Sequence, residues 1–263
     1  MTDRAATYLD AIVEAHRRTA AEDGRPSPSL LGAALAVESP VRGFRRALLE
    51  PGLSVIAEVK RRSPSKGMLR ADLDPAALAA DYARGGAACV SVLTDGAHFG
   101  GSVEDLRLAR GAVTIPVLRK DFTVCENDVY DARIMGADAV LLIAAVLSDE
   151  ELAHLHGCAA AVQLDVLVEI HDEVELARAL GVGADLIGVN QRDLHTFLVD
   201  QQRAVRVAKA MPDTVVRVAE SGVRGVEDAA ALAAAGFDAV LVGEHLVTSG
   251  DPAAGVRALR EAP

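Results

Sequence analysis

Charged side chains stand at the ends of several apolar runs in this sequence. The run "LSVIAEVK" ends with Glu58 and Lys60, and three later runs carry Lys120, Glu169 and Glu220 at or near their ends. Lysine and glutamate side chains that converge in a confined space shift one another's pKa values and can serve as general acids and bases. A structural network of ion pairs is the alternative, but buried charge pairs are often no more stabilising than packed apolar side chains. We therefore interpret these residues as catalytic.

Eight short apolar runs, separated by Ala- and Leu-rich segments with helical spacing, make up the chain from residue 53 onward. The runs are 53–60, 88–94, 116–122, 138–146, 165–170, 185–190, 214–221 and 238–244. Strand alternating with helix implies parallel strands, because each crossover needs a dozen or more residues. The even repetition favours a single (β/α)8 TIM barrel of the α/β class over a doubly wound sheet, and no GxGxxG follows the first run.

In such a barrel the active site lies at the carboxyl ends of the strands. The five charged residues then converge on one mouth, where Asn190 and Ser221 join them. Glu58 and Lys60 are two positions apart and therefore point to the same face of their strand. The loop "RRSPSKG" that follows is expected to be flexible, with Ser63 facing the substrate.

Glycine residues end the seventh and eighth runs, in "AESGV" at Gly222 and in "LVGEHL" at Gly243, and each precedes a predicted helix. Barrels commonly bind phosphate at this place through loop amides and a helix N-terminus. The sequence therefore predicts a small phosphorylated ligand.

The rest of the chain restricts the class of protein. A chain of 263 residues suits one barrel domain, and residues 1–50 form an additional helical extension that is expected to be either a bottom plug or a lid over the top. The formal net charge of −11 argues against nucleic-acid binding. The sequence has no apolar stretch of about 20 residues, so we expect no membrane span. It shows no signal peptide, and we therefore expect a cytoplasmic location.

Cysteine and histidine residues give no sign of a disulfide framework or a metal site. The three cysteines, Cys89, Cys125 and Cys158, form no CxxC pair and are expected to be reduced. In "HLHGC", His154 and His156 are two positions apart on a predicted helix and do not share a face. We therefore predict no metal site there.

Six ordered segments carry a resemblance to a known family: "IAEVKRRSPSKG", "VLRKDF", "VLVEIH", "GVNQRDLHTFLVD", "VAESGV" and "VLVGEHLV". Together with the helical extension, they resemble indole-3-glycerol phosphate synthase of tryptophan biosynthesis. The resemblance implies a carboxy-lyase that closes the indole ring of 1-(2-carboxyphenylamino)-1-deoxy-D-ribulose 5-phosphate with loss of carbon dioxide and water. It implies neither a metal nor an organic cofactor.

The resemblance also implies roles for the charged residues. Lys120 resembles the general acid that protonates the ketone oxygen, and we expect nearby cations to lower its pKa. Glu169 resembles the carboxylate that stabilises positive charge and exchanges a proton during dehydration. Lys60 resembles the lysine that contacts the substrate carboxylate or phosphate and acts as a second acid, with Glu58 as its base or orienting partner.

Further positions match the family's polar ring and its binding residues. Glu220 and Ser221 complete the polar ring, and Asn190 positions the substrate. The binding residues implied by the resemblance are Ser63, Phe122, Arg192, Gly222, Leu241, Gly243 and Glu244, of which Phe122 and Leu241 supply apolar walls. Gln191 departs from the family pattern, which often has Asn at this position. His195 stands at a variable position beyond the strand end, and we leave it out of the site.

Two alternative functions fit the same architecture. A barrel like phosphoribosylanthranilate isomerase would need a Cys or Asp base near the first strand end, where this chain has Glu58 and Lys60. A non-catalytic barrel that binds a phosphorylated metabolite would tolerate gaps in the ring of charges. The oligomeric state is left open, with a monomer and an association with other tryptophan-pathway enzymes both compatible.

Overall fold

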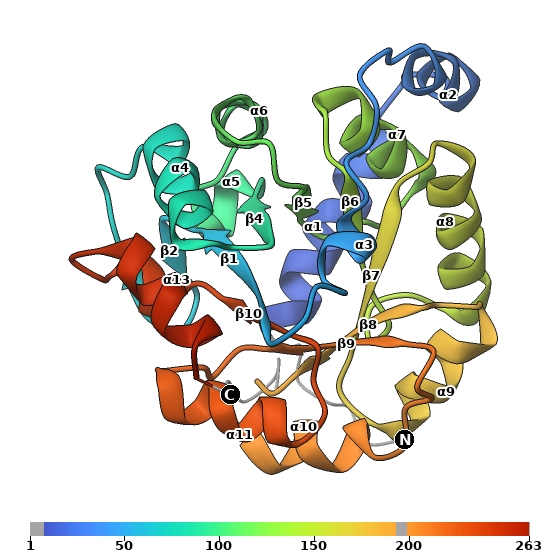
Figure 1. Ribbon diagram of the computed structural model, residues 1–263. Helices are drawn as coiled ribbons and strands as arrows, with labels where there is room; N and C mark the ends of the chain where they lie inside the picture. Colours follow the sequence, from blue (N-terminus) through green and yellow to red (C-terminus); the bar gives the residue numbers. More distant parts are fainter. Residues whose placement is uncertain (1–7, 193–198, 263) are drawn as a thin grey trace.

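Eight parallel strands close into a barrel in the computed structural model, which describes residues 8–192 and 199–262 (Figure 1). The strands are β1 (Ser54–Val59), β4 (Cys89–Leu93), β5 (Val117–Lys120), β6 (Ala139–Ile143), β7 (Asp165–Ile170), β8 (Leu186–Asn190), β9 (Val216–Glu220) and β10 (Ala239–Val242). Strand β1 pairs with both β4 and β10, which closes the barrel. The predicted (β/α)8 barrel is confirmed, and each strand lies within one of the predicted runs.

Helices cover the outside of the barrel. They are α4 (Pro75–Gly85), α5 (Gly96–Phe99), α6 (Val103–Ala112), α7 (Glu126–Met135), α8 (Asp149–Ala161), α9 (Glu173–Gly181), α10 (Gln201–Ala208), α11 (Val226–Ala234), α12 (Glu244–Val247) and α13 (Pro252–Arg260). Several begin at side chains that accept hydrogen bonds from the first turn, among them Asp74, Ser102, Ser148, Asp172, Asp200 and Asp251. Across residues 8–192 and 199–262, no helix is long and apolar enough to cross a bilayer.

The interior of the barrel changes from apolar to charged along the strands. Its buried apolar side chains include Ile56, Cys89, Leu118, Leu141, Leu167, Leu186 and Val218. Two positions after Ile56, Leu118, Leu167 and Val218, the strands carry the charged residues Glu58, Lys120, Glu169 and Glu220, respectively. Because residues two apart on a strand share a face, all four charged side chains also point into the barrel.

Helix α3 (Phe44–Ala47) closes the amino-terminal end of the barrel. Phe44 and Leu48 are fully buried and belong to the same apolar cluster as the barrel interior. The backbone N–H of Arg45 donates to Asp165 Oδ2 at the start of β7, with a distance of 2.9 Å. This part of the extension is therefore a plug.

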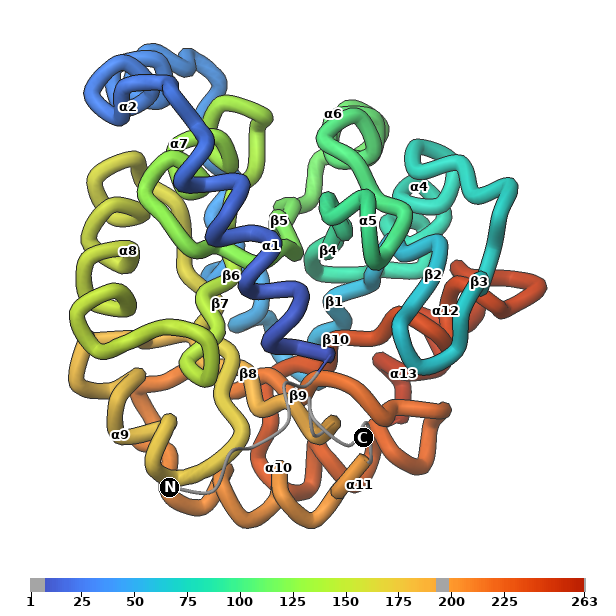
Figure 2. Tube along the Cα trace, turned by 180° about the vertical axis from the view of Figure 1, so that it is seen from behind, coloured from blue at the N-terminus to red at the C-terminus, as the bar shows by residue number. Residues whose placement is uncertain are grey.

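Helix α1 (Tyr8–Glu22) lies at the other end of the barrel, across the carboxyl ends of the strands (Figure 2). Arg17 pairs with Glu151 in the first turn of α8, with Nη1 2.6 Å from Oε1, and donates to the carbonyl oxygen of Val146. Helix α2 (Ser27–Leu35) packs against α7. The extension thus supplies both elements that the sequence left as alternatives, because α3 plugs one end and α1 covers part of the other.

The loop after β1, which was predicted to be flexible, contains a short antiparallel hairpin of β2 (Arg62–Ser63) and β3 (Gly67–Met68). Arg61 supports its base, because its guanidinium pairs with Asp105 and donates to the carbonyl oxygen of Leu73 at 3.1 Å. Ser63 therefore stands on a defined element beside the barrel mouth.

Candidate active site

A cavity of about 860 Å³ opens at the carboxyl ends of the strands. It is lined by every residue that the sequence predicted for the site: Glu58, Lys60, Ser63, Lys120, Phe122, Glu169, Asn190, Arg192, Glu220, Ser221, Gly222, Leu241, Gly243 and Glu244. The structure therefore brings the whole predicted set together in one place.

Lys120 lies between two buried carboxylates. Its Nζ is 3.0 Å from Glu169 Oε2 and 3.2 Å from Glu220 Oε2. Asn190 donates through Nδ2 to the other oxygen of Glu169, Oε1, at 3.0 Å. Because β5, β7, β8 and β9 each contribute one of these groups, closure of the barrel is what assembles them.

A second ion pair, between Lys60 and Glu58, lies at the end of β1. The adjacent Gly243 leaves room for it, because a Cβ atom on Gly243 would overlap Glu58 Oε1 and lie 2.9 Å from Lys60 Nζ. The φ angle of Gly243 is −113°, so the glycine is required here by space and not by backbone conformation. Gly188 on β8 has the same function for Glu220, since a Cβ atom there would overlap Oε1.

The carboxylates raise the pKa of Lys120. Burial alone would lower this pKa, but the charges of Glu169, Glu220 and Glu58 outweigh burial and raise it well above its usual range. The expectation of a lowered pKa was therefore wrong. The ammonium of Lys60, a cation at the same barrel mouth, is paired with Glu58.

The two glutamates beside Lys120 have opposite pKa shifts. Burial raises the pKa of Glu220 from 4.5 to about 7, and the charge of Glu169 adds to the rise, while Lys120 opposes it. Burial also disfavours the charged form of Glu169, but Lys120, His171 and the Asn190 amide together lower its pKa to about 2. Among the described residues, Glu220 Oε1 has no hydrogen-bond partner, whereas both oxygens of Glu169 are engaged.

The loop after β9 has strained backbone at the place predicted for phosphate. Ser221 and Gly222 have φ angles of 66° and 76°, in the left-handed region that a serine rarely adopts. Gln191 holds this loop by donating through Nε2 to the carbonyl oxygen of Ser221 at 2.8 Å. The next loop leads through Gly243 directly into α12. Both loops line the cavity, as does the Ser63 hairpin.

Apolar side chains line another part of the cavity: Leu93, Phe99, Phe122, Leu141, Ile143 and Leu241. The Phe122 ring lies 6.5 Å from that of Phe99 and 5.3 Å from the His16 ring on α1. The cavity thus combines an apolar region, suited to a planar ring, with charged groups and loop backbone suited to anions.

A model of the indole-3-glycerol phosphate synthase family matches residues 9–259. The chain belongs to this family. Indole-3-glycerol phosphate synthases from Mycobacterium tuberculosis (strain ATCC 25618 / H37Rv) and Mycobacterium avium (strain 104) are each 50% identical over 252 residues, which cover 95% of this chain and 93% of each relative. A solved structure of thiamine phosphate pyrophosphorylase from Pyrococcus furiosus has a TM-score of 0.62 over 85% of this chain and 97% of its own. Its sequence identity is 15%, so it supports the fold alone.

The family assignment fixes the reaction and its small phosphorylated substrate. The synthase is a carboxy-lyase of tryptophan biosynthesis, which forms indole-3-glycerol phosphate with release of carbon dioxide and water. Neither the isomerase-like barrel nor the non-catalytic barrel is supported by these matches.

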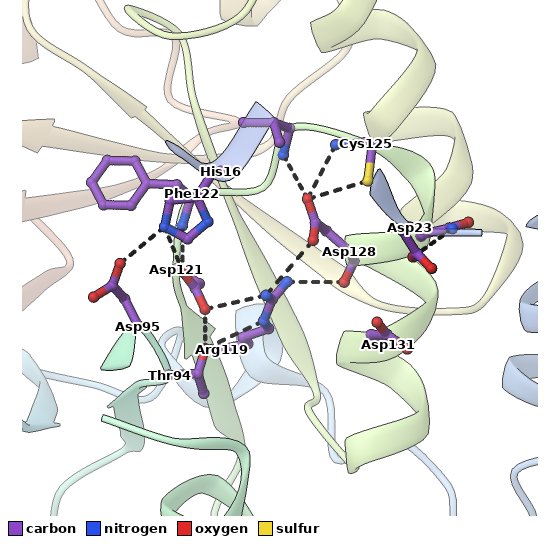
Figure 3. A network of polar contacts seen from close by, with 12 residues as sticks. His16, Asp23, Thr94, Asp95, Arg119, Asp121, Phe122, Cys125, Asp128 and Asp131 are labelled. Atoms are coloured by element: carbon purple, nitrogen blue, oxygen red, sulfur yellow. Dashed lines mark hydrogen bonds and ion pairs between the residues drawn. The ribbon is translucent and has the colours of Figure 1, made fainter. Parts of the chain in front are cut away.

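Some residues around the synthase cavity were missed from the sequence. Asp95 and Asp121 line it directly, and His16 reaches Asp95 from α1 (Figure 3). The sequence could have indicated Asp121, because it directly follows Lys120 in "RKDF". It could also have indicated Gly188, because a glycine inside a strand such as "LIGVN" often marks a place where another group approaches closely. Nothing in the sequence indicated His16, because it lies 79 positions before its partner Asp95. His195, which was left out of the predicted site, lies outside the described residues.

Helix α8 contains "HLHGC" as predicted, but the contact within this segment joins His154 to Cys158 and not to His156. His154 shares a helix face with Cys158, four positions on, and its Nε2 is 3.7 Å from Sγ. Glu126 of α7 adds a carboxylate oxygen 3.1 Å from the same nitrogen. These three residues form a group of candidate ligands that the spacing of His154 and His156 did not reveal.

Proposed function

We propose that Lys120 is the general acid of ring closure. The aromatic carbon attacks the ketone carbon, and the resulting alkoxide takes a proton from the Lys120 ammonium. The observation that carries this proposal is the position of Nζ between the carboxylates of Glu169 and Glu220 inside the cavity. The carboxylates keep the lysine protonated, and an alkoxide is a much stronger base than an amine, so the proton transfer is favourable.

Glu169 is assigned to the positive charge that develops on the substrate nitrogen, and to proton exchange during dehydration. Its lowered pKa keeps the carboxylate ionised at neutral pH. Lys120 and Asn190 hold one oxygen each, so the carboxylate is oriented before the substrate arrives.

Lys60 is assigned to an anionic group of the substrate and to the second acid step, with Glu58 as its base or orienting partner. The pair lies directly beside Gly243, at the loop predicted to bind phosphate. A single acid is poorly placed to serve both the ketone oxygen and the leaving hydroxide. Two lysines, Lys60 beside Glu58 and Lys120 between Glu169 and Glu220, allow a separate acid for each step.

The remaining cavity residues are assigned to substrate binding. Loop positions for the carboxylate and phosphate are Ser63, Gly222, Gly243 and Glu244, while Ser221 completes the polar ring with Glu220. Asn190 and Arg192 position the substrate, and Phe122 and Leu241 contact the aromatic ring. We also place the enzyme in the cytoplasm, where its pathway substrate would be formed.

Indole fluorescence gives the test of this assignment. The chain has no Trp, so product formation is observed against a low background. Lys120→Met should abolish product formation while substrate still binds in a calorimetric titration. Lys209→Met, at an exposed position after α10, is the matched control and should keep full activity. Turnover of Lys120→Met close to that of the control would refute the proposed role.

A further inference from the structure

Two histidines and an aspartate converge where α1 meets the loop between β4 and α5. His16 Nε2 is 2.9 Å from Asp95 Oδ2, and His98 Nδ1 is 3.0 Å from the same oxygen. The three ligand atoms all lie within 4.8 Å of one another. Imidazole nitrogens combined with a carboxylate oxygen are a donor set that suits zinc and similar divalent transition metals.

We propose that His16, Asp95 and His98 form a binding site for a divalent transition metal, best suited to Zn²⁺, and that the bound ion fastens α1 to the barrel mouth. This site is separate from the proton-transfer groups of the reaction. It does not depend on the roles assigned to Lys120 and Glu169.

The position of Asp95 leaves one oxygen for a metal. Its Oδ1 accepts the backbone N–H groups of His98 and Phe99 at 2.5 and 3.2 Å, as the N-cap of α5. Its Oδ2 is the oxygen shared by the two imidazoles. An ion held by Oδ2 and both rings would therefore replace those hydrogen bonds without disturbing the cap.

A second carboxylate stands next to the cluster and is held in place. Asp121 Oδ1 lies 3.8 Å from His16 Nε2, so a small shift would make it a fourth ligand or a partner of a metal-bound water. Arg119 Nη2 lies 3.2 Å from the other oxygen, Asp121 Oδ2, and Thr94 donates its hydroxyl to it. Such outer contacts orient metal ligands in known sites. Figure 3 shows Asp95 and Asp121 pointing toward the His16 ring.

The ligands are half-enclosed and come from parts of the chain that are distant in sequence. The side chains of His16 and His98 are 22% and 23% exposed, which leaves an entry path, while that of Asp95 is 3% exposed. His16 belongs to the extension and the other two belong to the barrel, so the complete site exists only with α1 in place. A bound ion would oppose the departure of α1, and it would do so beside Phe122 at the cavity wall.

The group of Glu126, His154 and Cys158 is the main competitor for a metal added in vitro. The His154 side chain is 59% exposed, and all three residues lie on two adjacent helices outside the barrel. The experiment therefore starts from the full chain with His154→Ala, treated with chelator, so that binding at that group is removed.

Co²⁺ is the spectroscopic probe, because a tetrahedral or five-coordinate site gives visible absorption that Zn²⁺ then abolishes by displacement. We expect His154→Ala to bind one Co²⁺ per chain. Adding either His16→Ala or His98→Ala should weaken binding by at least about tenfold, whereas adding His156→Ala, a control on α8, should not. Unchanged affinity in both ligand variants, or no binding to the His154→Ala protein, would overturn the proposal.

Two measurements keep the result independent of folding defects. Far-UV circular dichroism and urea unfolding of each variant report whether its barrel is intact. In the wild-type chain, the imidazole resonances of His16 and His98 should both shift on addition of Zn²⁺, and amide hydrogen exchange in α1 should slow. Zn²⁺ that leaves these resonances and the α1 exchange rates unaltered would refute the site and its fastening of α1.

Discussion

Glu220→Gln should change how the stability of the protein depends on pH. Glu220 is 1% exposed, its Oε1 has no hydrogen-bond partner among the described residues, and its pKa is raised from 4.5 to about 7. Glutamine has nearly the same shape and carries no charge at any pH. The substitution therefore isolates the cost of ionising this one buried carboxyl group.

The sign and size of the effect follow from linkage. Between pH 4.5 and about 7 the folded protein holds a proton on Glu220 that the unfolded chain has released, so the free energy of unfolding decreases as pH rises. Each pKa unit corresponds to about 1.4 kcal/mol, which gives about 3 kcal/mol in total. Glu169 acts in the opposite direction, but its contribution is gained between about pH 2 and 4.5, before this window begins.

Urea unfolding of wild type and Glu220→Gln at pH 4, 5, 6, 7 and 8 measures the effect. The variant should become more stable relative to wild type by about 3 kcal/mol between pH 4 and 8. Taking the difference between the two proteins cancels the titrating groups that do not interact with Glu220. Glu227→Gln, at an exposed position on α11, supplies the baseline for loss of a surface carboxylate. A difference that stays constant over this range would refute the raised pKa of Glu220.

Three further substitutions test the site. Lys120→Ala should lower kcat by about 10³-fold or more without preventing substrate binding, and turnover near the wild-type rate would exclude its acid role. Gly243→Ala should raise KM, because the added Cβ displaces the Lys60 pair from the anion-binding loop; an unchanged KM would contradict this. Gly188→Ala should displace Glu220 and destabilise the fold by about 1–3 kcal/mol, as judged by urea unfolding against Gly157→Ala, which meets nothing within 4 Å on α8.

The sequence was sufficient for the barrel and for the residues at its mouth because both depend on local periodicity. Alternation of strand and helix specifies parallel strands, and the carboxyl end of each strand is readable from where its apolar run stops. Lys120 follows Leu118 by two positions and Glu169 follows Leu167 by two, so each must share the inward face of its apolar neighbour. This rule needs no knowledge of tertiary contacts.

The contacts between strands were not readable in this way. The pKa of Lys120 depends on which charges face it across the barrel, and those belong to residues 49 and 100 positions later, Glu169 and Glu220. The placement of α1 depends on His16 and Arg17 reaching loops far along the chain. The hairpin after β1 depends on Arg61 pairing with Asp105. Each of these features is set by long-range packing and not by spacing.

The unequal shifts of the two glutamates match the proton balance of the reaction. The substrate loses a negatively charged carboxylate as neutral carbon dioxide. Charge balance therefore requires the net uptake of one proton in each turnover. Two protons are consumed, at the ketone oxygen and at the leaving hydroxide, and one is returned when the ring becomes aromatic. A lysine with a raised pKa regains its proton readily after donating it, and Glu220 Oε2 lies 3.2 Å from its Nζ as a nearby proton donor. A carboxyl group with a pKa of about 7 is half protonated at neutral pH and can exchange with solvent in either direction. Glu169, held ionised by Lys120 and Asn190, carries no proton to pass on at neutral pH, so we assign this proton exchange to Glu220.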